Sequence, residues 1–121
     1  MQTLEGLEVY NLARRFRKEI SIMSRSFPAE EKYLLKQQII RSSKSVTAQI
    51  AEGHGRFHDK ENIQYCRIAR RSLLETQGHI NVAFDEGYIE EKEATRLKAY
   101  QLDVLKMLNG YIRYLKKKTG T

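Results

Sequence analysis

The residue types that most often bind metal ions lie around one glycine-rich segment. His54 and His58 flank this segment, and Cys66 follows it. Zinc takes three or four such ligands at fixed spacing. Two histidines on a loop and one thiol facing the core fall short of that set, so we interpret the histidines as solvent-exposed loop residues. We expect no metal site and no cofactor.

Serine side chains offer a second kind of chemistry, nucleophilic attack. Ser42, Ser43 and Ser45 lie close together, but a serine nucleophile needs a neighbouring base and an orienting acid. In a four-helix register no histidine lies near these serines, and no inner face carries paired carboxylates for acid–base catalysis. The segment 53–55 lacks the spacing and the lysine of a phosphate-binding P-loop. We therefore predict a protein that is not an enzyme and takes no small-molecule substrate.

Lysine and arginine residues form clusters that could contact phosphate groups. The net charge is +7, and the acidic residues concentrate in a turn at 85–93, away from the basic ones. Helix dipoles explain some of this pattern, but not the arginines that lie well inside a helix at 67–71. We expect these cations to lie on helix surfaces without aromatic side chains placed to stack on a base, and therefore to contact the backbone phosphates of RNA or DNA. The candidates are Arg56, Lys60, Arg67, Arg70, Arg71, Arg113, Lys116, Lys117 and Lys118.

Four helices must position these residues. Apolar residues recur every three to four positions, and small side chains such as Ser42 and Ala51 would let a second helix approach closely. Glycines at 53 and 55 end one helix, and Asp59 is a plausible N-cap for the next. The pattern predicts helices at about 4–24, 28–52, 59–86 and 90–115, with a frayed lysine-rich end.

Short turns between these helices predict an all-α, antiparallel, up-down-up-down four-helix bundle. We assign residues 1–121 to a single domain. Turn positions place Ser42 near the level of Arg70, and Arg41 about one helical turn from the level of Glu75. A long arginine side chain can span that distance, so we expect an Arg41–Glu75 ion pair that fixes the register of the helices.

Composition indicates which cellular compartment suits the protein. No apolar run approaches the roughly 18 residues that a membrane span requires, and the first residues lack the layout of a signal peptide. Cys66 is the only cysteine, which excludes an internal disulfide and favours a reducing compartment. We expect a cytoplasmic protein with no membrane partner.

Six ordered motifs resemble those of the four-helix-bundle proteins encoded in intervening sequences of bacterial 23S rRNA genes. They are GLEVYxLA at 6–13, FPxEExY at 27–33, QIxRS at 38–42, IAEGxGR at 50–56, SLxETQ at 72–77 and MLNGxI at 107–112. The chain departs from the family at Thr47 and Gln49, where Pro and Asn are usual, and at His58, where Ser often caps a helix.

This resemblance implies a ring-shaped homo-oligomer, a pentamer, and a distant kinship with the accessory protein of diversity-generating retroelements. That protein works with a reverse transcriptase and nucleic acid. Arg41, Glu52, Gly53 and Glu75 all lie in the matching motifs, and we interpret them as structural.

Two functions remain open from the sequence. One is a nucleic-acid-binding assembly, in which a ring multiplies the basic surface of each subunit. The other is an adaptor or scaffold that binds protein, with the charge serving solubility. Apolar residues beyond the four core stripes suggest subunit contacts in either case. They are Leu12, Ile40, Ile68, Leu74, Tyr100, Leu102, Tyr111 and Tyr114.

Overall fold

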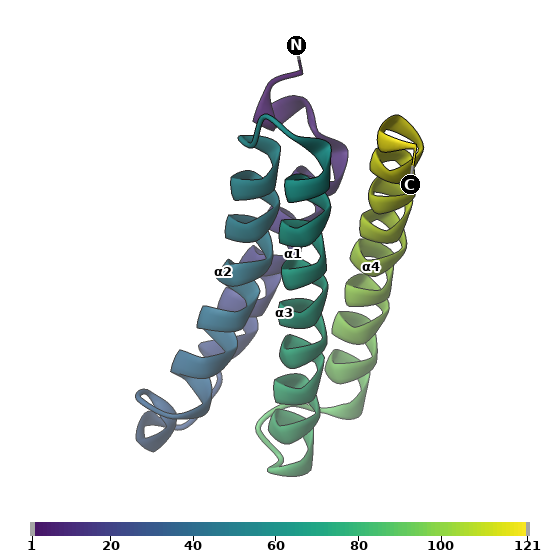
Figure 1. Cartoon of the computed structure of the whole chain (residues 1–121). Helices are drawn as coiled ribbons and strands as arrows, with labels where there is room; N and C mark the ends of the chain where they lie inside the picture. The colour runs from purple at the N-terminus through teal and green to yellow at the C-terminus, as the bar shows by residue number, and fades with distance from the viewer. Residues whose placement is uncertain (1, 121) are drawn as a thin grey trace.

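The computed structural model describes residues 2–120, and four long helices make up most of it (Figure 1). Met1 and Thr121, the ends of the predicted domain, lie outside the described residues. No strand occurs between residues 2 and 120, so the all-α prediction is confirmed. The elements are η1 (Leu4–Gly6), α1 (Glu8–Ser24), η2 (Ala29–Glu31), α2 (Leu35–His54), α3 (Asp59–Asp85) and α4 (Glu91–Thr119).

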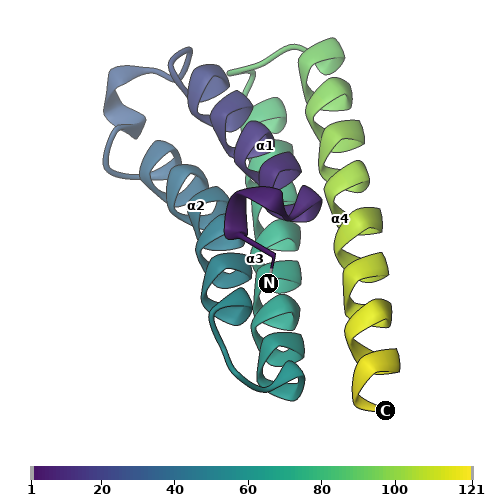
Figure 2. The ribbon, with the colours of Figure 1, turned by 90° about the horizontal axis from the view of Figure 1, so that it is seen from above.

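The helices form a bundle in which each helix contacts two neighbours. Helices α2 and α4 lie on either side of α3 (Figure 1), and α1 packs against both α2 and α4, across the bundle from α3 (Figure 2). Polar contacts run in opposite numerical order along α3 and α4: Arg70 meets Asn109, and further along α3 Asn81 meets Lys98.

The first two helices start later than the apolar pattern predicts. Thr3 caps a short 3-10 turn, and extended Leu7 (φ −88°, ψ 112°) separates that turn from α1. Pro28 is also extended (φ −63°, ψ 154°) and leads into η2 rather than into α2. The backbone breaks again at Leu34 (φ −117°, ψ −109°), so α2 starts one residue later. The apolar periodicity alone does not reveal such breaks in a helix, because the side chains on both sides of each break still pack on the core.

The other two helices differ from prediction at their ends. His58, not Asp59, is the N-cap of α3, and it makes no side-chain capping hydrogen bond. The Asp59 carboxylate instead pairs with Lys118, 3.4 Å away. Helix α4 does not fray at Lys116 but runs to Thr119, where Gly120 ends it in the left-handed conformation (φ 74°). Only glycine adopts that conformation without a steric penalty.

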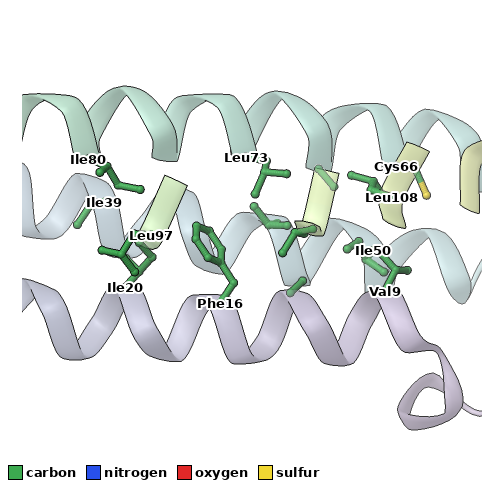
Figure 3. Close-up of a cluster of buried hydrophobic side chains, with 14 of the residues drawn as sticks. Val9, Phe16, Ile20, Ile39, Ile50, Cys66, Leu73, Ile80, Leu97 and Leu108 are labelled. Atoms are coloured by element: carbon green, nitrogen blue, oxygen red, sulfur yellow. The ribbon is translucent and has the colours of Figure 1, made fainter. Parts of the chain in front are cut away.

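A single apolar core fills the bundle, and each helix contributes the stripe that its periodicity predicts. Phe16 and Ile20 from α1 lie among Ile39, Leu73 and Leu97 from the other three helices (Figure 3). These five side chains are fully buried.

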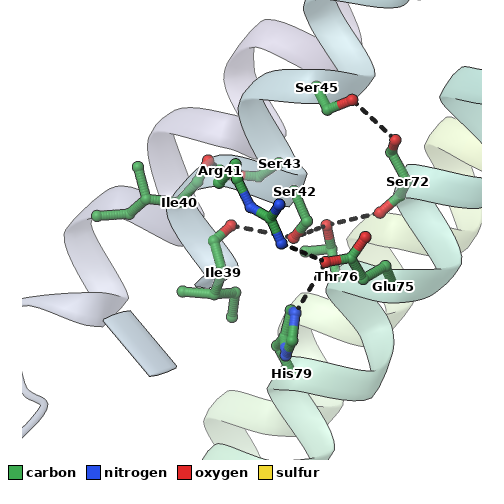
Figure 4. Close-up of polar contacts among 10 residues, drawn as sticks. All are labelled: Ile39, Ile40, Arg41, Ser42, Ser43, Ser45, Ser72, Glu75, Thr76 and His79. Atoms are coloured by element: carbon green, nitrogen blue, oxygen red, sulfur yellow. Dashed lines mark hydrogen bonds and ion pairs between the residues drawn. The ribbon is translucent and has the colours of Figure 1, made fainter. Parts of the chain in front are cut away.

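Hydroxyl groups form a polar seam between α2 and α3 within this core. Ser42 and Thr76 are buried with their hydroxyl oxygens 2.8 Å apart, and the hydroxyls of Ser45 and Ser72 are 2.9 Å apart (Figure 4). Each hydroxyl also has a carbonyl acceptor on its own helix: that of Ile39 lies 3.2 Å from the Ser42 hydroxyl, and that of Ser72 lies 2.9 Å from the Thr76 hydroxyl, so either hydroxyl can donate to the other. Both buried hydroxyls are therefore satisfied, which fixes how α2 lies along α3.

This seam corrects the predicted register, because Ser42 lies level with Thr76 and not with Arg70. The linker 55–58 does not turn straight back: His58 is extended (φ −98°, ψ 130°). The first turn of α3 therefore lies beyond the end of α2, and every later residue of α3 is displaced by more than one turn.

The predicted ion pair between Arg41 and Glu75 is present, with 3.4 Å between Nη2 and Oε2 (Figure 4). His79 also contacts that carboxylate, with Nε2 3.1 Å from Oε2. The side chains of Arg41 and Glu75 are 72% and 45% exposed. A pair this exposed contributes only about 0–1 kcal/mol, so the buried hydroxyl seam determines the register more strongly than this pair does.

Helix α3 packs tightly against α2 at Gly53. A Cβ atom added there would lie 2.5 Å from Oδ1 of Asn62 and 2.9 Å from Cβ of Tyr65. Ala51, which the sequence placed in the tight contact, is only half-buried. The residue that must stay small is therefore Gly53.

We expect Gly53→Ala to lower the free energy of unfolding by about 1–3 kcal/mol, because α3 must move away to admit the methyl group. Gly78→Ala is the matched control, since a Cβ at that helical position meets nothing within 4 Å. The control should instead stabilise the protein by roughly 0.5–1 kcal/mol through helix propensity. Urea denaturation measures both, and equal effects of the two substitutions would contradict the close contact.

Candidate nucleic-acid interface

Six basic side chains line the solvent side of α3 and α4. On each helix they recur at i, i+7 and i+11, a spacing that keeps them on one helical face. Five of them are exposed, and the sixth, Arg67 on α3, is half-buried. Within residues 2–120 none of the six has a carboxylate within 4.0 Å. We call this surface the α3–α4 basic face: Lys60, Arg67, Arg71, Lys106, Arg113 and Lys117.

A hydrogen bond between the helices places the two basic stripes side by side. Nη1 of half-buried Arg70 donates to Oδ1 of Asn109 at 2.8 Å. Arg70 adjoins Arg71, and Asn109 lies about one turn from both Lys106 and Arg113. Arg70, which was predicted to contact phosphate, therefore joins the two helices through a neutral partner and keeps its positive charge.

Arg56, another predicted phosphate ligand, fastens the α2–α3 linker. Its Nη2 lies 2.7 Å from the carboxylate of Glu52, and its Nη1 lies 3.9 Å from that of Glu61. The guanidinium also lies over the ring of Tyr65, 4.8 Å from the centroid. Glu52, predicted to be structural, is thus a partner of Arg56. Two carboxylates and a ring already occupy this guanidinium, so it has little capacity left for phosphate.

The three lysines at the end of α4 do not form one patch, because successive residues on a helix point about 100° apart. Lys117 belongs to the α3–α4 basic face. Lys118 turns to Asp59, and its ammonium also lies 5.5 Å from the centroid of the Tyr114 ring. Lys116 is half-buried. All three lie in the last helical turn, where positive charge stabilises the helix.

Lys106 belongs to this surface but was not among the predicted contacts. The signal was present in the sequence, because Lys106 precedes Arg113 by seven residues and so shares its helical face. The prediction grouped cations that are neighbours in sequence near the C-terminus. A helix instead places residues that are two turns apart on the same face.

The prediction of two exposed loop histidines is correct for His58 but wrong for His54, which is the last residue of α2 and half-buried. His54 contacts the backbone of the N-terminal segment, with Nε2 3.0 Å from the carbonyl oxygen of Gln2, and the His58 ring lies edge-on to Phe57. Cys66 is fully buried. Among residues 2–120 no group of three or more His, Cys, Asp or Glu side chains is arranged to hold a metal ion. In the same range, no helix combines the length and the apolar character needed to cross a membrane.

Comparison with known proteins places this bundle in a family. Residues 5–110 match the model of the family described as 23S rRNA-intervening sequence protein. The chain belongs to this family. None of the curated proteins compared with it matches.

The crystal structure of another protein has a similar fold. It is a protein of unknown function from the S23 ribosomal protein family of Bacteroides thetaiotaomicron. The two superpose with a TM-score of 0.79 at 20% identity, over 86% of this chain and 97% of that one. At this identity the likeness concerns the fold alone.

Burial makes the Cys66 thiol of this family member unreactive, because it raises the pKa of the thiol from 9.0 to about 12. Only the thiolate attacks disulfide reagents. We expect Ellman's reagent at pH 8 to leave Cys66 unmodified in the folded protein and to modify it fully in denaturant. Rapid modification without denaturant would contradict the buried position.

Proposed function

We propose that this protein is a non-enzymatic homo-oligomer that binds RNA or DNA through the backbone phosphates. The observation that carries the proposal is the α3–α4 basic face, with six cations and no carboxylate close enough to neutralise them. Lysine and arginine gain affinity for phosphates by releasing counterions, whatever the base sequence.

The proposal includes an antiparallel up-down-up-down bundle that assembles into a ring, with five subunits as the family resemblance implies. The opposite numerical order of the contacts along α3 and α4 supports the alternating helix directions. Exposed apolar side chains support association. Leu74 and Leu102 are 52% and 45% exposed on neighbouring helices, and Tyr114 is 56% exposed. A ring repeats the basic face once per subunit, so that weak phosphate contacts add up along one strand.

These same apolar residues favour the second candidate, an adaptor that binds another protein. The two candidates differ in their response to salt: phosphate binding weakens steeply as salt rises, whereas binding through apolar surface does not.

We expect the double variant Arg113→Gln/Lys117→Gln to bind random-sequence RNA more weakly than the parent at low salt. The slope of log affinity against log salt should fall by roughly 0.7–0.9 for each phosphate that the variant no longer neutralises. Fluorescence anisotropy between about 50 and 200 mM salt, the range in which such binding changes most, measures both quantities.

A charge-matched control is Arg25→Gln/Lys92→Gln, which removes two exposed cations outside the α3–α4 basic face. The control should retain the affinity and slope of the parent. Equal weakening by both double variants would mean that only net charge matters. A parent that binds no RNA near 50 mM salt would leave the adaptor as the function.

We expect light scattering at micromolar concentration to report a mass several times that of the 14.2 kDa chain, because the exposed apolar side chains gain by association. Five subunits would give about 71 kDa, five times 14.2 kDa. A mass of 14.2 kDa would contradict the oligomer without excluding nucleic-acid binding.

A further inference from the structure

The outer side of α2 carries a groove that the predicted nucleic-acid contacts do not include. Its volume is about 580 Å³. Helix α3 separates α2 from α4, so the groove does not continue into the stripe of the basic face on α4 (Figure 1). The lining combines basic and apolar side chains and contains no acidic residue: Lys32, Tyr33, Lys36, Ile40, Arg41 and Lys44 supply most of it.

An exposed aromatic ring stands at one end of this groove. Tyr33 is 75% exposed in the segment that leads into α2, and the Lys32 ammonium lies 5.3 Å from the centroid of its ring. The Tyr88 hydroxyl, by contrast, donates to Glu31 at 2.9 Å, and its ring packs against Phe27. The Tyr33 ring thus offers a planar surface to a ligand.

Two lysines continue the groove along the helix. Lys36, Ile40 and Lys44 recur at i, i+4 and i+8, which places them on one face of α2. Ile40 points away from α3 (Figure 4), and it lines the groove together with Lys36 and Lys44. Eight residues span about 12 Å along a helix. Arg41 is partly neutralised by Glu75, so Lys36 and Lys44 are the stronger sites for phosphate.

We propose that this groove binds single-stranded nucleic acid, with a base stacked on Tyr33 and backbone phosphates held by Lys36 and Lys44. The inference rests on the proposed function in that it concerns the same class of ligand, but it adds a second surface and a preference for single strands. Bases stack on aromatic side chains whatever their sequence. A duplex keeps its bases stacked on one another and cannot offer a free face to the ring. An acidic peptide would meet the lysines but would leave the ring without a planar partner.

The absence of tryptophan from the chain allows a direct test of stacking. Tyr33→Trp introduces a single tryptophan in the groove, and Phe84→Trp places one at an exposed position beside the acidic turn that ends α3. The probes are a mixed-sequence single-stranded RNA and a matched oligonucleotide with the same number of phosphates but with abasic positions. We expect RNA to quench the fluorescence of Tyr33→Trp strongly, and to quench that of Phe84→Trp only weakly. The abasic strand should quench neither.

Affinity supplies the second readout. Stacking is worth about 1–3 kcal/mol per base, so Tyr33→Ala should weaken binding of the single strand about 5- to 150-fold. Tyr33→Phe should retain the affinity, because it keeps the ring. Binding of a duplex of the same sequence should not change in either variant. Tyr33 is exposed, so circular dichroism should show an unchanged fold.

Two outcomes separate this inference from the proposed function. If Tyr33→Ala binds single strands like the parent while Arg113→Gln/Lys117→Gln weakens binding, the groove is not a base-stacking site and the phosphate-binding function stands. If the parent binds neither single strands nor duplex, both proposals fail. Equal quenching by RNA, by the abasic strand and by polyglutamate would also overturn the groove proposal, since it would show attraction by charge alone.

Discussion

The close approach of α2 and α3 at Gly53 is the contact on which the rest of the bundle depends. Asn62 of α3 lies directly opposite Gly53 of α2, and its Nδ2 donates to the hydroxyl of Tyr111 on α4 at 3.0 Å, so this one side chain contacts both neighbouring helices. A larger side chain at 53 would therefore push on the residue that also holds α4. The small residue Gly53 sets the distance between α2 and α3. The hydrogen bond from Asn62 to Tyr111 then fixes the position of α4 relative to these two helices.

Further contacts fix the register of α3 against α2 on one side and against α4 on the other. Toward the opposite end of the bundle, the Ser42–Thr76 and Ser45–Ser72 contacts keep α2 and α3 in step. Hydroxyl pairs of this kind need close backbones, which the small side chains of the seam allow. On the far side of α3, Arg70 reaches Asn109, and the basic stripes of the two helices come to lie next to one another. Surface charge is thus arranged by contacts that are themselves partly buried.

The sequence predicts the four helices and their core stripes because burial imposes a period of 3.6 residues on the choice of side chains. It does not predict the register across the α2–α3 linker, because an extended segment and a tight turn of the same length differ only in backbone angles. The candidate interface is likewise only partly predictable from the sequence. Helical spacing places Lys106 beside Arg113, but only the structure shows that Arg56, Arg70 and Lys118 already have partners.

Among the lysines and arginines of residues 2–120, Arg41, Arg56, Arg96 and Lys118 pair with a carboxylate within 4.0 Å. Exposed ion pairs contribute only about 0–1 kcal/mol, so Arg56 and Lys118 are paired mainly because the fold holds their carboxylates nearby. The α3–α4 basic face has no such carboxylates, and its like charges repel one another in the free protein. A bound polyanion relieves that repulsion. The proposed recognition of phosphate would give these six cations on adjoining helices the opposite charge that the fold itself does not place within 4.0 Å of them.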